Sequence, residues 1–172
     1  MKSLMNKIRT IAFVMCVALV IGACQQQDQT QTRQVPVAIQ ASDECHVCGM
    51  NIQSFPGPKG QAFVRGRAAP FKFCSTADTF SWLLQPDSAA IVTSAFVHDM
   101  GAAPEWDKPS EAHYVNVKQA WYVVGHDMPG AMGPTLASFK QKQDAEKFVK
   151  QHGGRILRYP DINLALLANL SK

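Results

Sequence analysis

The sequence pattern changes from that of a strand to that of a helix cap within Phe71-Lys72-Phe73-Cys74-Ser75. The alternating aromatic side chains predict a short strand. Ser75 is a favoured N-cap residue and predicts a helix over Thr76–Leu84, which we expect Pro86 to end. A second strand near Gln61–Gly66 precedes this stretch, so the order is a hairpin followed by a helix.

The remainder of the chain repeats this order. We expect strands at Ile91–His98, Ala120–Val124 and Thr135–Phe139, a helix at Gln141–His152, a strand at Arg155–Tyr159 and an apolar helix from Asp161. The sequence therefore predicts an α+β fold of two related hairpin-plus-helix (ββα-type) halves packed together, about residues 43–88 and 89–172. It contains no glycine-rich phosphate loop.

The first 23 residues have the features of an export signal. Basic residues precede an apolar run of 13 residues, Ile11–Ala23, which is shorter than the roughly 18–20 apolar residues that span a bilayer. Removing this segment removes three positive charges and no acidic residue, so the formal net charge falls from +4 to +1. That balance gives nucleic-acid binding no support, and we expect no nucleic-acid partner.

The signal ends Val20-Ile21-Gly22-Ala23-Cys24, which resembles the bacterial lipoprotein signal, whose cysteine is acylated. An ordinary secreted protein with a chance cysteine is the alternative. Acylated Cys24 would anchor the protein in a lipid membrane, and Gln25 resembles the sorting signals that direct such proteins to the outer membrane, facing the periplasm. Six of the ten residues Gln25–Gln34 are Gln, so we expect residues 24–42 to form a flexible lipidated tether.

Metal chemistry is concentrated in Cys45-His46-Val47-Cys48-Gly49-Met50. Two thiols separated by two residues can reach one centre, Gly49 permits a tight turn, and a thioether follows. Thiolate and thioether donors together favour Cu(I), whereas zinc more commonly combines thiolates with imidazoles. An inert disulfide, a structural zinc turn and a redox-active pair remain alternatives.

The methionines support a copper site. The four that survive processing each have Gly or Pro within two residues: Met50, Met100, Met128 and Met132. Methionines that fill a core usually lie on helices and strands, so we expect at least one besides Met50 to bind copper. The segment His126–Gly133 is the richest second cluster, and His46 and His126 are possible nitrogen donors.

Two resemblances include these residues. Cys45–Met50, followed by Phe71–Ser75, resembles the treble-clef metal module of the YHS/TRASH type, with C-x-x-C-G-M and then F-C-S-x-x-C. The last cysteine of that pattern is Asp78 here, so an all-cysteine zinc site is not expected.

The larger resemblance covers nearly all of Cys24–Lys172 and is to the NosL family. Its motifs are the lipoprotein start, C-x-x-C-G-M, F-C-S-x-x-D, Val97-His98-Asp99, Ala120-Trp121-Tyr122-Val123-Val124-Gly125, Met132-Gly133, Ala145-x-x-Phe148 and His152-Gly153-Gly154. The resemblance implies a NosL-like copper-binding domain over residues 43–172, on a fold akin to organomercurial lyase. It implies a Cu(I) chaperone for the copper–sulfide centre of nitrous oxide reductase, working with a membrane-bound ABC-type maturation complex.

Positions carried over from the family imply Cys48, Met50 and Met132 as copper ligands. Cys45 could be a ligand or a transient partner, and Ala131 stands where family members commonly have Pro, which leaves Met128 or His126 as substitutes for Met132.

Cys74 and Asp78 are expected to shape the hairpin–helix junction. The sequence shows no catalytic constellation, so we expect no enzyme. The alternative function is a thiol redox or mercury-handling module that uses Cys45 and Cys48.

Overall fold

The structure is a computed structural model that describes residues 34–170. The predicted signal peptide, the lipidation site at Cys24 and residues 24–33 of the predicted tether lie outside the described residues. Within residues 34–170, no helix is both long and apolar enough to cross a bilayer.

The first sheet has four antiparallel strands in the order β2-β1-β3-β4. Its strands are β1 (Gly60–Val64), β2 (Phe71–Phe73), β3 (Val92–His98) and β4 (Tyr114–Asn116), and helices α2 (Thr76–Leu83) and α3 (Pro86–Ile91) connect β2 to β3. The Ser75 hydroxyl accepts a hydrogen bond from the Asp78 N–H, as expected for the N-cap of α2. Helix α2 ends at Leu83, before Pro86, close to the predicted bounds. The fixed φ of Pro86 suits a first helical position, and this residue begins the separate helix α3.

The second sheet has three antiparallel strands in the order β8-β5-β9. Its strands are β5 (Trp121–Val124), β8 (Ala137–Phe139) and β9 (Arg155–Arg158), with α4 (Lys142–His152) between β8 and β9 and a small hairpin, β6 (Pro129–Gly130) and β7 (Gly133–Pro134), between β5 and β8. Helix α4 ends at Gly153, whose φ of 73° favours glycine. The chain finishes with α5 (Leu164–Ala168). Short 3₁₀ turns at η2 (Ile52–Ser54), η3 (Met100–Ala102) and η4 (Tyr159–Asp161) complete the elements.

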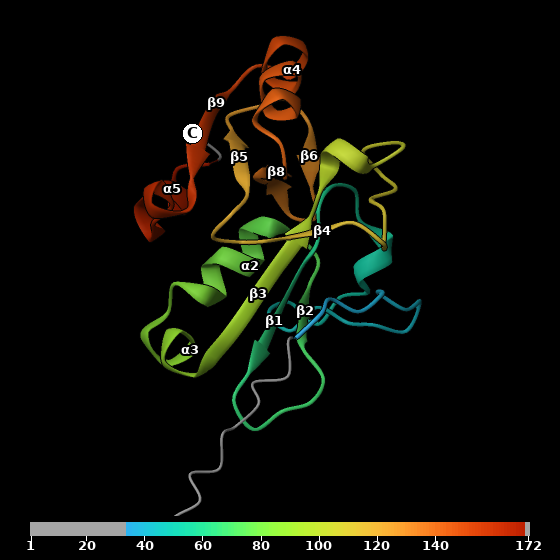
Figure 1. Ribbon diagram of the computed structural model, residues 1–172, viewed down its shortest axis with the longest axis vertical. Helices are drawn as coiled ribbons and strands as arrows, with labels where there is room; N and C mark the ends of the chain where they lie inside the picture. The colour runs from blue at the N-terminus through green and yellow to red at the C-terminus, as the bar shows by residue number, and fades with distance from the viewer. Residues whose placement is uncertain (1–33, 171–172) are drawn as a thin grey trace, which may run out of the picture. The chain divides into compact units, whose positions relative to one another are not determined.

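The mixed helix-and-sheet architecture confirms the predicted α+β class. The two sheets have the same order of elements, in which a hairpin and a helix are followed by a strand that pairs with the first strand of the hairpin (Figure 1). This order is compatible with two related halves. Strand β3, which the sequence analysis places in the second half, pairs with β1 in the first sheet.

Residues 34–42 pack against the domain instead of continuing the predicted flexible tether. The Gln61 side chain accepts a hydrogen bond from the Val37 N–H and donates one to the Val37 carbonyl. Ile39 is buried, and its N–H donates to the Glu111 carboxylate at 2.8 Å. The glutamine-rich composition before residue 35 misled the prediction, because the backbone of Val37 and the buried side chain of Ile39 have partners on the folded part.

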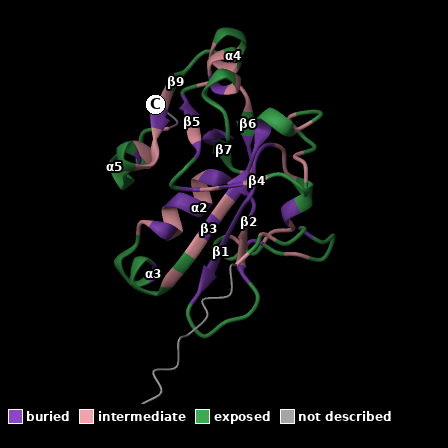
Figure 2. Ribbon diagram, viewed as in Figure 1, coloured by how far each residue is buried: buried purple, intermediate pink, exposed green. Residues whose placement is uncertain are grey.

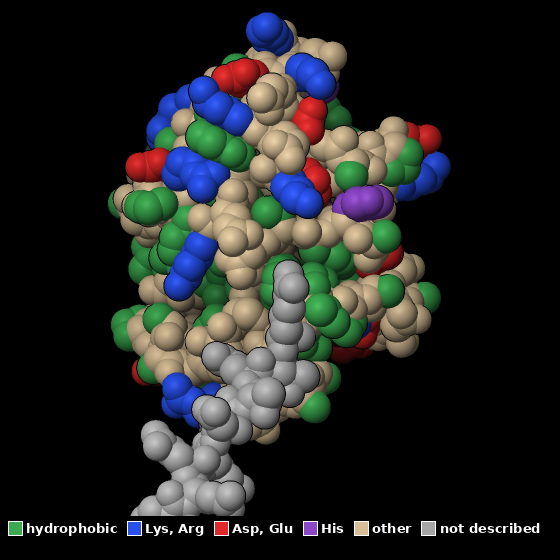
Figure 3. Space-filling view, in the orientation of Figure 1, with side chains coloured by type: hydrophobic (Ala, Val, Ile, Leu, Met, Phe, Trp, Pro, Cys, Tyr) green, Lys and Arg blue, Asp and Glu red, His purple; other side chains and the backbone are tan. Residues whose placement is uncertain are grey.

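The core lies between the sheets and α2. Figure 2 shows β1 and the end of β3 as buried, whereas α3 and much of α4 are exposed. The largest buried side chains include Phe73, Phe80 and Tyr122, and the rings of Phe80 and Tyr122 meet edge to face at 5.1 Å. Figure 3 shows basic and acidic side chains interspersed over the face in view.

Candidate metal site

The segment Cys45–Met50 forms a closed turn. The Cys45 N–H donates to the Met50 carbonyl and the Gly49 N–H donates to the Cys45 carbonyl, each at 2.8 Å. Gly49 has a φ of 71°, a conformation that other residues rarely adopt. The His46 N–H donates to the Lys72 carbonyl, which attaches the turn to β2. The local sequence therefore fixes both cysteines against the end of this strand.

Cys74 and Asp78 enter the site from the junction of β2 and α2. Cys74 is the first residue after β2, and its thiol donates to the Asp78 carboxylate at 3.0 Å. The same carboxylate oxygen accepts a hydrogen bond from the Ser75 hydroxyl. The N-cap that starts α2 therefore also orients Asp78.

Four side chains converge at this junction: Cys45, Cys48, Cys74 and Asp78. Their sulfur and oxygen ligand atoms all lie within 4.8 Å of one another, and the Cys48 and Cys74 sulfur atoms are 3.5 Å apart. The three thiols are free, so the structure does not contain the disulfide that the sequence left open. Cys45 and Cys74 are buried, whereas Cys48 and Asp78 are half-buried, which leaves one side of the cluster open to solvent.

The pKa values of Cys45 and Cys74 differ because the two side chains interact with each other. The side-chain interaction with Cys74, helped by backbone N–H groups, lowers the pKa of Cys45 to about 5 against the opposing effect of burial. The same contact with Cys45 raises the pKa of Cys74, and burial and the nearby Asp78 carboxylate raise it further. The positive end of α2 adds stabilisation for negative charge at this place. The metal-free cluster therefore holds one thiolate readily and keeps Cys74 protonated.

Three sulfur donors make the cluster a soft metal site. Several thiolates within reach of one another suit Cu(I) and also zinc, and a carboxylate is the harder member of the set. Because the Asp78 carboxylate accepts hydrogen bonds from Cys74 and Ser75, it can orient the thiols without binding metal itself. The cluster can bind a soft cation after losing a proton from at least one further thiol.

The predicted methionine ligands lie in different environments. Met50 is half-buried and closes the cysteine turn, whereas Met132 is 69% exposed at the tip of the β6–β7 hairpin. The hairpin is attached near the cluster, because the Thr135 hydroxyl lies 2.8 Å from that of Thr76, the first residue of α2. Met132 is three residues from Thr135, so their Cα atoms are at most about 11 Å apart. Both methionines remain predicted ligands.

The alternative donors have structural partners. The Nδ1 atom of His126 accepts a hydrogen bond from the Met128 N–H, and its ring meets those of Trp106 and Phe148 edge to face. Burial lowers the pKa of His126. Met100 is buried in the small core of the second sheet. His46 is exposed and stacks on Phe71 with ring centres 3.8 Å apart.

Sequence reasoning gave Cys74 and Asp78 only a role in shaping the junction. Asp78 does hydrogen-bond at the start of α2, and both residues also belong to the four-residue cluster. The signal that could have revealed them is F-C-S-x-x-D, because it places a thiol and a carboxylate four residues apart at the start of a helix, where both can face one point.

Comparison with known proteins assigns this arrangement to a family. The NosL family model matches residues 36–167, which include every residue of the cluster. The chain belongs to the NosL family. It is 47% identical to the copper-binding lipoprotein NosL of Stutzerimonas stutzeri, over 90% of this chain and 80% of that protein. It is 33% identical to the copper-binding lipoprotein NosL of Achromobacter cycloclastes, over 94% and 83%.

A solved NosL structure supports the fold. The crystal structure of the copper chaperone NosL from Shewanella denitrificans matches with a TM-score of 0.73 and 45% sequence identity. The match covers 77% of this chain and 97% of that structure. The NosL relatives thus share nearly the whole described domain.

Proposed function

We propose that this protein is a lipid-anchored, periplasm-facing Cu(I) chaperone that supplies copper for the copper–sulfide centre of nitrous oxide reductase. In this proposal the protein catalyses no reaction itself. The observation that carries the proposal is the convergence of three thiols and a carboxylate within 4.8 Å. The names of the NosL relatives, which describe copper binding and, for the crystal structure, a copper chaperone, support the metal and the role.

The geometry suits a carrier that must release its cargo. Cys45 and Cys74 are buried, while Cys48 is half-buried and Met132 is exposed. A partner could therefore approach the open side and replace ligands one at a time. Thioether ligands support this exchange, because methionine binds soft metals without a negative charge and carries no proton to titrate.

Anaerobic titration of the mature domain with Cu(I), read by native mass spectrometry, tests copper binding. We expect one Cu(I) per chain. Cys48→Ser should remove most of the affinity while the fold survives, because this substitution removes a thiolate at the open side of the cluster. His113→Ala, at an exposed position outside the cluster, is the matched control. Equal affinity in Cys48→Ser, or strong preference for zinc, would contradict the proposed site.

The cluster also favours a second candidate function, a thiol redox or mercury-handling module. The low pKa of Cys45 and the 3.5 Å separation of the Cys48 and Cys74 sulfur atoms are the supporting observations. Turnover of a dithiol substrate, or retention of Hg(II) without measurable Cu(I) binding, would support this function over copper delivery.

Copper delivery itself is tested in cells that contain the reductase. Deletion of this gene should leave nitrous oxide reductase exported but deficient in its copper–sulfide centre, most strongly when copper is scarce. Pull-down with the ABC-type maturation complex tests that partner. Normal reductase activity in the deletion strain under copper limitation would contradict the proposal.

The membrane anchor is tested separately. Labelled fatty acid should be incorporated into the wild-type protein and not into Cys24→Ser, which should be released as a soluble domain. Fractionation of inner and outer membranes then tests the expected outer-membrane location.

A further inference from the structure

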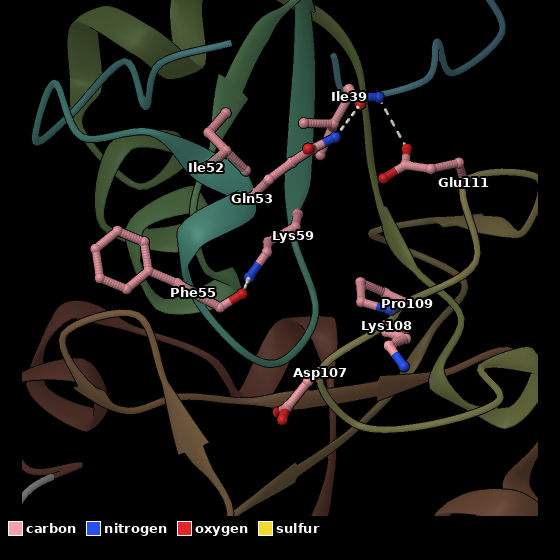
Figure 4. Close-up of a pocket in the computed structure, with 9 residues that line it drawn as sticks. All are labelled: Ile39, Ile52, Gln53, Phe55, Lys59, Asp107, Lys108, Pro109 and Glu111. Atoms are coloured by element: carbon pink, nitrogen blue, oxygen red, sulfur yellow. Dashed lines mark hydrogen bonds between the residues drawn. The ribbon is translucent and has the colours of Figure 1, made fainter. Parts of the chain in front are cut away.

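Lys59 is a buried lysine whose charge has no close acidic partner. The residue is 3% exposed, and its ammonium donates hydrogen bonds to the carbonyls of Phe55 and Pro56 at 2.6 and 2.8 Å. Figure 4 shows the side chain turned toward the Phe55 carbonyl. Among the described residues, no carboxylate lies within 4.0 Å of this ammonium. Lysine is almost never buried in this way without a counter-charge.

The two acidic residues of the adjoining cavity do not account for this burial. Asp107 and Glu111 line the same cavity of about 260 Å³ as Lys59 (Figure 4). Glu111 already accepts hydrogen bonds from the Ile39 N–H and the Tyr114 hydroxyl, and Asp107 is exposed. Solvent therefore screens both carboxylates from the buried ammonium.

The strand register relates Lys59 to the cysteine cluster through the position of Cys74. Gly60, the first residue of β1, pairs with Phe73, the last residue of β2. Continuing this antiparallel register places Lys59 opposite Cys74, and opposite residues project from the same face of a sheet. Burial lowers the pKa of Lys59 to about 8, and a thiolate at Cys74 would oppose this shift more strongly than Asp107 or Glu111.

A cysteine cluster that holds Cu(I) would be stabilised by a nearby positive charge such as that of Lys59. Three thiolates around one Cu(I) would carry two net negative charges, to which the Asp78 carboxylate adds another. Buried charge in excess is unfavourable unless an opposite charge lies nearby. The N-terminal end of α2 supplies only a partial positive charge. Lys59 is a buried cation that this register places on the same face of the sheet as Cys74.

We propose that Lys59 is a positioning residue of the metal site, whose buried positive charge balances the thiolates and so strengthens Cu(I) binding without touching the metal. The inference rests on the proposed function. It assigns to Lys59 a role that neither the cysteine motif nor the methionines predict.

The test is a double-mutant cycle of Cu(I) affinity, measured by anaerobic competition with a chromophoric chelator. Lys59→Met keeps the length and apolar stem of the side chain and should weaken binding at least tenfold, or about 1.4 kcal/mol. In the Asp78→Asn background, where the cluster carries one negative charge less, the same substitution should weaken binding less than about threefold. Charge balance predicts this non-additivity, whereas a purely structural role predicts equal losses in both backgrounds.

Lys108→Met is the matched control, because Lys108 lines the same cavity but is exposed and pairs with Glu105 at 3.1 Å. It should leave Cu(I) affinity unchanged. The ultraviolet thiolate-to-copper band should persist in Lys59→Met, which shows that the same thiolates still hold the metal, and urea unfolding checks that the variant folds.

The possible outcomes separate the two proposals. Cys48-dependent binding in the wild type, with unchanged affinity in Lys59→Met or equal losses in both backgrounds, would overturn the role of Lys59 alone. Absence of Cu(I) binding by the wild-type protein would overturn the proposed function and this inference with it.

Discussion

At the scale of single residues, the three thiols of the cluster hold their protons unequally. The side-chain interaction with Cys74 lowers the pKa of Cys45. The same interaction, together with burial and the hydrogen bond that the Cys74 thiol donates to Asp78, raises the pKa of Cys74. Copper must therefore displace a proton from Cys74 if that residue becomes a ligand. The acidity of a thiol at this site is decided by its neighbour more than by its own burial.

This difference predicts a titration of the metal-free protein. One thiolate equivalent should appear in the absorbance at 240 nm with a midpoint near pH 5, because the pKa of Cys45 is lowered to about 5. Cys45→Ser should abolish that step. A wild-type titration with no thiolate below pH 7 would show that the interaction with Cys74 does not stabilise the Cys45 thiolate.

Single substitutions can also show which of Met132, Met128 and His126 binds copper. Met132→Leu should change the free energy of unfolding by less than about 0.5 kcal/mol, since it alters an exposed side chain. If Met132 binds copper, the Cu(I) affinity of this variant should fall about tenfold, or about 1.4 kcal/mol. Met128→Leu and His126→Ala are the comparison variants. A weakened Met128→Leu or His126→Ala beside an unaffected Met132→Leu would reassign the ligand, and three unaffected variants would confine the site to the cysteine turn and α2.

At the scale of elements, the β2–α2 junction does two tasks with the same atoms. Ser75 caps α2 by accepting from the Asp78 N–H, and its hydroxyl donates to the carboxylate that also accepts from Cys74. Stability of the helix and orientation of the metal cluster are therefore coupled.

Ser75→Ala tests this coupling. Loss of the N-cap should lower the free energy of unfolding by about 1 kcal/mol, measured in urea. Cu(I) affinity should fall too, because Asp78 loses one of the two groups that hold it. Ser81→Ala, within the same helix and away from its cap, is the control. Unchanged stability in Ser75→Ala would mean that other contacts suffice to start the helix.

At the scale of the whole molecule, the two sheets meet at the end of β3. The Ser138 hydroxyl of β8 donates to the His98 carbonyl at 2.7 Å, and the Lys140 N–H donates to the Asp99 carboxylate. His98 is fully buried, and its Nδ1 atom accepts from the Lys59 N–H. A titratable ring therefore lies where the sheets join.

Stability should fall as the pH falls below about 6.5. Burial lowers the pKa of His98, although the interaction with Glu111 opposes the shift. The unfolded chain then binds a proton at this histidine at a pH where the folded protein does not, so acid favours unfolding. Urea unfolding at pH 7.5 and pH 5.5 measures the loss, and His98→Gln should flatten it. An unchanged pH dependence in His98→Gln would assign the loss to other groups, among them His126, whose pKa burial also lowers.

The local features of the fold could be predicted from the amino-acid sequence. The strand alternation and N-cap of Phe71–Ser75, the turn at Gly49 and the helix end at Gly153 are decided by neighbouring residues, and the structure has each of them. The C-x-x-C-G-M motif and the family resemblance likewise lie in the order of residues along the chain.

The contacts between residues distant in sequence could not be predicted and are seen in the three-dimensional structure alone. The approach of Cys74 to Cys48 depends on how β2 packs against the cysteine turn, and the pairing of β3 with β1 and the docking of residues 34–42 depend on which distant surfaces fit. The position of Lys59 opposite Cys74 also depends on how distant strands pair, because no neighbouring residue in the sequence indicates this register. Local rules act through neighbouring backbone dihedral angles and hydrogen bonds, whereas these contacts arise from burial of side chains across the fold.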